Sequence, residues 1–231
     1  MEMEKMEELV RDAVNDADLH HSEIPSIDLY LDQIISLVAD KRREGSPRFY
    51  DRDLTKTMIN NYSKDGLIEP IKGKKYSKDH ILQMLIVYSL KNTLSIGEIK
   101  RILENIYRLP EYDSEMLERV YDRFLAIKDY ERAHAWEGVQ AFTARENLSA
   151  ESEEDFLTMI LGLSAMSSYL KNIVQALLES HYIYPDEKKD IEKRERKEAA
   201  ERMKEEKKAE KQAAKKNKEE PVEADDAEAS K

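Results

Sequence analysis

The amino-acid stretch that decides the fold is TKTMINNYSKDGLIEPIKGKKYSKDHILQMLIVYSLKNTLSIGEIKRIL, residues 55–103. It opens with a helical pattern in which Thr55 can cap the first turn and Gly66 can end the last one. Apolar residues at three- and four-residue spacing give this helix one apolar face and one polar face. The polar face carries Lys56, Thr57, Asn60 and Lys64.

A short turn and two further helices follow this first helix. Pro70 and Gly73 interrupt the helical pattern, so residues 67–77 predict a short hairpin or wing, with the basic wing itself at 71–76. The wing is basic, and its candidate binding residues are Lys72, Lys74, Lys75 and Tyr76. The spacing of Ile and Leu after Ser77 predicts a helix, and the capping box S-I-G-E predicts another that begins at Ser95.

The flanking sequence is also mainly helical in pattern. Ser26 can cap an amphipathic helix over residues 24–44, and residues 113–147 predict a helix that is bent or broken near Gly138. Residues 1–22 are acidic and show little apolar periodicity. We therefore expect a flexible acidic arm there.

The most apolar part of the chain is the stretch 152–184. Its apolar residues recur four and three positions apart, as in a heptad repeat: Phe156, Ile160, Leu163, Leu170, Val174 and Leu177. A helix this apolar must be covered, either inside the monomer or by a second copy in a homodimer, and the sequence leaves both possibilities open. The longest uncharged run, 156–170, has 15 residues. This is short of the ~20 needed to cross a bilayer, so we expect no membrane segment.

Charge is distributed unevenly along the chain. The 231 residues carry a net charge of −11, yet the block 48–108 holds 12 basic and 7 acidic residues. A polyanion would be repelled by most of the molecule and attracted to this block. From residue 186 to 231 the sequence is rich in Lys, Glu, Arg and Ala, which predicts a solvent-exposed charged helix and then a disordered acidic tail.

No catalytic pattern stands out. The chain has no cysteine, which excludes disulfides and thiolate chemistry, and none of its five histidines are four residues apart. Six scattered glycines cannot form a phosphate-binding loop. We expect neither an enzyme nor a metal or other cofactor. The acidic N-terminus lacks a signal-peptide pattern, so we expect a cytoplasmic protein.

Several elements of residues 55–103 resemble, in their order, the DNA-binding domain of MerR-type transcription regulators, a winged helix-turn-helix. They are the end of the first helix (Ile59, Tyr62, Gly66, Leu67, Ile68, Pro70), Tyr76, the helix that follows it, and the segment from Leu94 to Lys100. The resemblance implies that the helix 55–65 enters the major groove and that the wing contacts phosphates. Asn can bridge adenine N6 and N7, and Lys can reach guanine or phosphate. Residues 24–103 also resemble an uncharacterised bacterial domain-of-unknown-function family.

Together these patterns predict a mainly α protein. We expect a MerR-like winged-helix domain over 23–108, a helical bundle with possible dimerisation over 109–185, and the charged tail. The expected function is a transcriptional regulator that binds double-stranded DNA as a homodimer. The alternative is a non-catalytic adaptor that uses a degenerate winged-helix scaffold to bind another protein.

Overall fold

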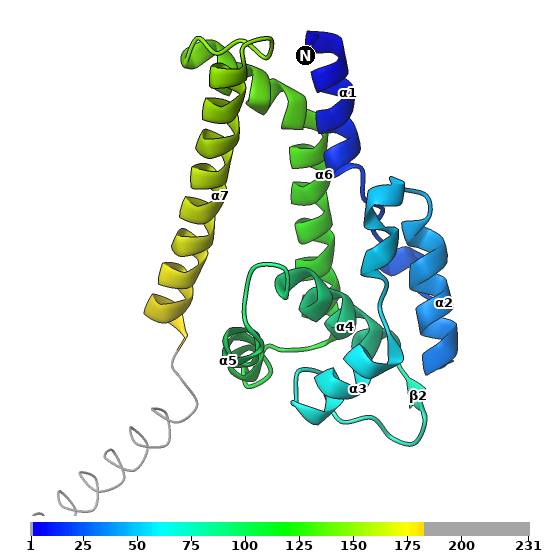
Figure 1. Cartoon of the computed structure of the whole chain (residues 1–231). Helices are drawn as coiled ribbons and strands as arrows, with labels where there is room; N and C mark the ends of the chain where they lie inside the picture. The colour runs from blue at the N-terminus through cyan, green and yellow to red at the C-terminus, as the bar shows by residue number, and fades with distance from the viewer. Residues whose placement is uncertain (1, 183–231) are drawn as a thin grey trace, which may run out of the picture. The chain divides into compact units, whose positions relative to one another are not determined.

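A computed structural model describes residues 2–182, apart from the side chains of residues 50–52. The described residues are mainly helical, which confirms the mainly α class (Figure 1). The elements are α1 (Met3–Val14), η1 (His21–Glu23), β1 (Leu29–Tyr30), α2 (Leu31–Arg42), η2 (Pro47–Arg52), α3 (Lys56–Lys64), β2 (Lys75–Tyr76), α4 (Lys78–Leu90), α5 (Ile96–Ile106), α6 (Ser114–Arg145) and α7 (Glu153–His181). The charged helix and tail predicted over 186–231 lie outside the described residues.

Helix α4 is the centre of the main hydrophobic core. Every side chain from Ile81 to Leu85 is buried, because α3, β2 and α6 all pack against this helix. The capping box at Ser77 fixes where α4 begins, and the one at Ser95 fixes the start of α5. Both predicted helix starts are confirmed.

The small antiparallel sheet joins the chain before α2 to the chain before α4. Leu29 pairs with Tyr76 and Tyr30 pairs with Lys75. The prediction that a helix begins at Ser26 is therefore wrong: α2 starts at Leu31, and the Ile27 side chain is 71 % exposed. The backbone of residues 29 and 30 makes ladder hydrogen bonds with a strand some 45 positions away, and no local pattern predicts such pairing.

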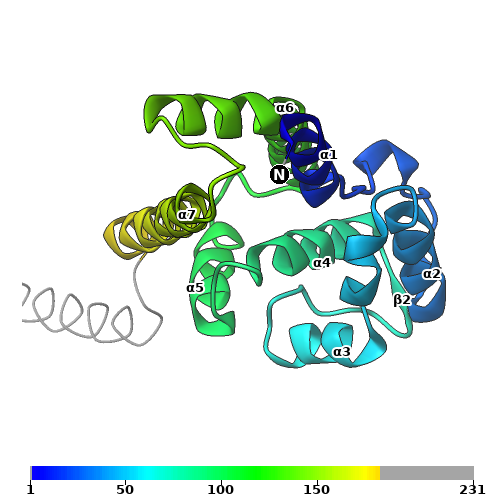
Figure 2. The ribbon, with the colours of Figure 1, turned by 45° about the horizontal axis from the view of Figure 1, so that its top comes forward.

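The N-terminal segment is not the flexible arm that the sequence predicts. Residues 3–14 form α1, which packs along α6 (Figures 1 and 2). Met6 is buried in a second, smaller core with Trp136, Phe142 and Met159. Val10, one turn after Met6, packs against the same core, so α1 does have a short apolar stripe at helical spacing. The prediction of a flexible arm overlooked this stripe among the acidic residues that surround it.

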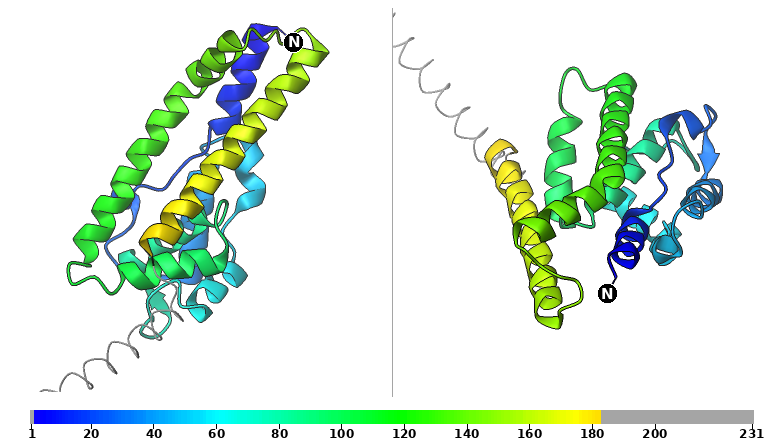
Figure 3. Two further views of the ribbon diagram at one scale, coloured as in Figure 1. Left: turned by 90° about the vertical axis from the view of Figure 1, so that its left-hand side faces the viewer. Right: turned by 90° about the horizontal axis from the view of Figure 1, so that it is seen from above.

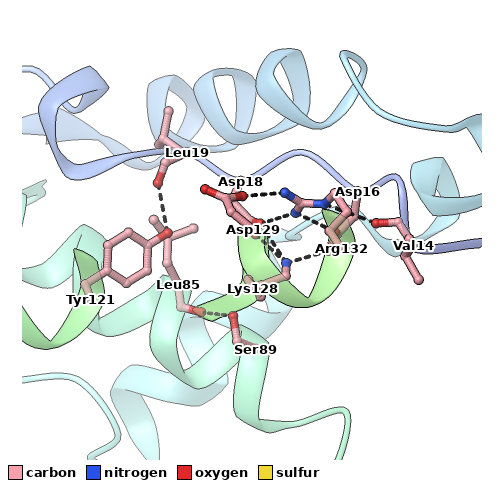
Figure 4. Close-up of polar contacts among 10 residues, drawn as sticks. All are labelled: Val14, Asp16, Asp18, Leu19, Leu85, Ser89, Tyr121, Lys128, Asp129 and Arg132. Carbon is pink, nitrogen blue, oxygen red and sulfur yellow. Dashed lines mark hydrogen bonds and ion pairs between the residues drawn. The ribbon is translucent and has the colours of Figure 1, made fainter. Parts of the chain in front are cut away.

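A cluster of ion pairs holds the segment after α1 against α6 (Figure 4). Lys128 Nζ lies 2.7 Å from an Asp18 carboxylate oxygen, and Arg132 Nη2 lies 2.8 Å from Asp16 Oδ1. The Tyr121 hydroxyl donates to the Leu19 carbonyl at 2.8 Å. Burial acts to raise the pKa of the Asp16 carboxyl, but hydrogen bonds from the two cations outweigh burial and hold this pKa below its usual range.

Helices α6 and α7 run in opposite directions and are joined at one end by residues 146–152 (Figures 1 and 3). Helix α6 is unbroken, and the ribbon bends toward its C-terminal end. Its first half buries Leu117, Tyr121 and Leu125 in the same core as α4. Residues 2–182 therefore pack as one unit, and the core continues across the boundary predicted between residues 108 and 109.

Candidate nucleic-acid interface

Helix α3 is fixed at both ends by local hydrogen bonds. The Thr55 hydroxyl accepts from the Met58 amide at 3.2 Å, as its N-cap. At the other end Gly66 adopts a φ of +72°, and the Leu67 and Gly66 amides donate to the carbonyls of Tyr62 and Ser63. This pair of bonds is a Schellman motif, which favours glycine at the left-handed position. Both predicted ends of this helix are confirmed.

The two faces of α3 divide between core and solvent. Ile59 and Tyr62 are buried, and burial raises the pKa of the Tyr62 phenol to about 12. The polar face is solvent-exposed along the whole helix: Lys56, Thr57, Asn60 and Lys64. These four side chains are therefore accessible to a ligand in solution.

The segment that follows α3 adds three exposed lysines. Lys72, Lys74 and Lys75 lie between α3 and the end of β2, in a turn where Gly73 has a φ of +85°. Figure 1 places α3 and this segment at the same end of the described unit, and Figure 2 shows the segment looping beside the helix. We call the exposed residues Lys56, Thr57, Asn60, Lys64, Lys72, Lys74 and Lys75 the α3–wing surface.

Two of these lysines have partners. Lys56 Nζ lies 2.6 Å from Asp32 Oδ1 at the start of α2, and Lys75 Nζ lies 5.2 Å from the centre of the Tyr30 ring. Both side chains of the ion pair are more than half exposed, so the pair contributes at most about 1 kcal/mol and a phosphate can replace the carboxylate. Within residues 2–182, no carboxylate forms an ion pair with Lys64, Lys72 or Lys74.

Tyr76 does not belong to this surface. The sequence predicts that its hydroxyl holds a phosphate, but the side chain is only 5 % exposed and packs in the main core, edge-on to the His80 ring. The alternation of side chains along a strand explains why the predicted phosphate contact of Tyr76 is wrong. Lys75 and Tyr76 are adjacent in β2, so their side chains point to opposite faces, and Lys75 takes the solvent side.

The predicted dimer residues lie on α7, which is exposed over most of its length. Its two buried residues are Met159 and Leu178. Phe156 is half-buried, and the remaining members of the heptad pattern are exposed: Ile160, Leu163, Leu170, Val174 and Leu177. Burial inside the described unit, one of the two possibilities left open by the sequence, is therefore excluded for these five residues.

Sequence reasoning missed the residues next to the α3–wing surface. Asp32 and Tyr30 contact its lysines, yet they come from β1 and the start of α2, which are placed there by strand pairing. The sequence offered no signal for Tyr30, because it fits the helical spacing of Ile27 and Ile34 and was therefore assigned to the apolar face of the helix predicted over 24–44. The described residues contain no cluster of three or more metal-ligating side chains.

Comparison with known proteins gives one family match. Residues 19–124 match the family model described as domain of unknown function DUF1836. The match contains the whole α3–wing surface and ends within α6, so α7 lies outside it. No curated protein and no solved structure matches the chain.

Helix α7 is also the one helix of the described residues that is long and apolar enough to cross a membrane. This test considers length and composition alone, and a core helix of a soluble protein also passes it. Unlike such a core helix, α7 is almost entirely unburied in the described unit.

Proposed function

We propose that this protein binds double-stranded DNA through the α3–wing surface, as a transcriptional regulator. The observation that carries the proposal is the exposed polar face of α3, which lies beside a lysine-rich turn. This face presents the Asn60 amide, two lysines and the Thr57 hydroxyl. Amide and ammonium groups on an exposed helix can read base edges in a major groove, and lysines at its flank can bind phosphates.

The order of elements also supports the proposal. β1, α2, α3, the basic turn and β2 follow one another, and β2 closes the unit by pairing with β1. A winged helix-turn-helix of the MerR type has a comparable plan of two helices and a wing. The connection from Arg42 to Lys56, which contains η2, is longer than the usual three- or four-residue turn. We therefore expect phosphate contacts to contribute more affinity than base contacts.

We further propose that the DNA-binding form is a homodimer that covers α7. Ten large apolar side chains on this helix are between 36 % and 66 % exposed. An exposed apolar surface of this kind is typical of a protein–protein interface. In a two-fold dimer, α7 of a second copy would pack its own apolar side chains against it. A bilayer suits it less well, because Lys171, Asn172 and Gln175 interrupt its second half.

Fluorescence anisotropy with labelled duplexes tests the DNA-binding proposal. Duplexes selected from a random pool should bind the full chain, and the double variant Lys74→Glu/Lys75→Glu should bind at least tenfold more weakly. The matched control is Lys5→Glu/Lys100→Glu, which changes the net charge equally at exposed or half-exposed sites on α1 and α5. Equal affinities of the wild type and the Lys74/Lys75 variant would refute the proposal.

The exposed apolar surface of α7 also favours the adaptor as a second candidate function. In that case α7 would bind another protein, and the α3–wing surface would be a solvated scaffold. Purification of the tagged full chain distinguishes the two. A stoichiometric protein partner with no nucleic acid in the complex supports the adaptor, whereas co-purifying nucleic acid supports DNA binding.

A further inference from the structure

A hydrophobic cavity of about 290 Å³ lies between α4, α5 and α6. Ile86 and Leu90 line it from α4, Ile102 and Ile106 from α5, and Phe124 from α6. Its floor is the main core, since Leu103, Leu117 and Tyr121 are all buried. Its mouth opens beside the half-exposed side chain of Val120. The cavity is separate from the α3–wing surface.

No charged side chain lines the cavity, and five of its six polar side chains already make hydrogen bonds within the protein. Gln83, 1 % exposed, donates to Glu69 Oε2 at 2.7 Å and to the Tyr112 hydroxyl at 2.9 Å, and its amide oxygen accepts from the Glu69 amide. The Tyr107 and Tyr121 hydroxyls donate to backbone carbonyls. A charged ligand would lose its hydration here without compensation, so the chemistry favours a neutral, apolar occupant.

The volume limits the size of this occupant. An apolar cavity of about 150 Å³ can bind benzene, so 290 Å³ has room for roughly two linked or fused rings. A partner helix would need several anchor positions along a longer groove. The size therefore indicates a small molecule rather than a helix of a second chain.

Hydrogen bonds connect the cavity wall to the end of α3. The Tyr107 hydroxyl donates to the Leu67 carbonyl at 2.9 Å, and Leu67 is the residue whose amide completes the Schellman motif of α3. Gln83 holds Glu69, two residues further along, with two bonds. A ligand that packs against Tyr107 and Gln83 would therefore contact the residues that fix where α3 ends and the basic turn begins.

We propose that this cavity binds a neutral, mainly apolar small molecule with one or two rings, and that its occupancy stiffens residues 66–71. The effect on DNA affinity rests on the proposed function: a more ordered connection between α3 and the basic turn lowers the ordering cost of binding, so the ligand strengthens DNA binding. The cavity site itself does not depend on that function.

N-phenyl-1-naphthylamine is a suitable probe, because it is neutral and its fluorescence rises in apolar surroundings. The full chain should bind it saturably with one site per chain. Ile86→Trp and Ile106→Trp, which place an indole ring in the cavity, should each weaken binding at least tenfold. The matched control Ile160→Trp makes the same change on exposed α7 and should leave binding unchanged.

Hydrogen exchange of the wild type, with and without the probe, then tests the connection to α3 in the absence of DNA. Amides of residues 66–71 should exchange several-fold more slowly with the probe, and Tyr107→Phe should abolish this protection while the probe still binds. Probe binding and protection without any DNA binding would refute the proposed function and leave the cavity proposal standing.

Three results would overturn the cavity proposal. The first is no saturable binding to the wild type. The second is equal binding by wild type and both cavity variants, which would assign the probe to another apolar surface such as α7. The third is binding that is lost as protein concentration rises and dimers form, which would assign the cavity to a second copy.

Discussion

Replacing Leu163 and Leu170 on α7 by glutamate is expected to convert a homodimer into a monomer. Both side chains are exposed in the described unit, by 36 % and 63 %. Together they therefore offer about one whole leucine side chain for burial in a partner interface. The residues lie seven positions apart, so they occupy the same side of the helix.

The size of the effect follows from this area. Burying one full leucine side chain contributes about 1.5–3 kcal/mol, and a two-fold interface contains the pair twice, which gives roughly 3–6 kcal/mol per dimer. At 1.4 kcal/mol per factor of ten, the dissociation constant of the dimer should rise by about 10²–10⁴. Placing four carboxylates in an apolar interface adds to this increase.

Light scattering at micromolar concentration measures the outcome. The wild type should have twice the 27.0 kDa mass of one chain, and the double variant should have the single-chain mass with an unchanged circular dichroism spectrum. The control Ser168→Glu/Asn172→Glu adds the same charge at exposed polar positions of α7 and should dimerise like the wild type. A monomeric wild type, or a double variant that still dimerises, would refute the assignment of this interface.

Three further predictions concern stability. Gly66→Ala should lower the free energy of unfolding by about 1 kcal/mol in urea denaturation, because alanine is strained at a φ of +72°; no loss would contradict the role of the Schellman motif. Gly138→Ala should stabilise α6 by about 0.5–1 kcal/mol, because the space around Gly138 is open and alanine favours a helix. A Cβ at Gly162 would instead lie 2.5 Å from Phe142 Cζ. In thermal melts, Gly162→Ala should therefore be the less stable of the two variants. The pKa of the Asp16 carboxyl in the folded protein is below its ordinary value of 3.8. The ionised carboxylate therefore adds to the free energy of unfolding above pH 3.8, and this stabilisation is lost as the pH falls through the lowered pKa. The urea midpoint of Asp16→Asn should therefore be lower than that of wild type at pH 7, and the gap should narrow progressively as the pH falls below 3.8. A gap that stays constant with pH would contradict this linkage.

The helix ends were the part of the fold that the sequence predicted well. Thr55, Ser77 and Ser95 each cap the helix expected, and Gly66 ends α3 as a left-handed glycine should. These features depend on hydrogen bonds between residues two to five positions apart, so the information is local. The start of α2 was missed because β1 pairs with a strand far along the chain.

The candidate site was predicted in composition and only partly in geometry. The polar face of α3 follows from the 3.6-residue period, and all its residues are exposed as expected. Tyr76 was misplaced because the face of a two-residue strand depends on its partner, β1. The apolar cavity had no signal at all, since it arises from how α4, α5 and α6 pack around one another.

The salt dependence of duplex DNA binding tests the central claim most directly. Each phosphate bound by a lysine contributes about −0.9 to the slope of log K against log salt concentration. The triple variant Lys64→Gln/Lys72→Gln/Lys74→Gln should therefore have a slope shallower than wild type by roughly three units per protomer. A wild type that binds duplex DNA with the same slope as the triple variant would contradict the assignment of the α3–wing surface.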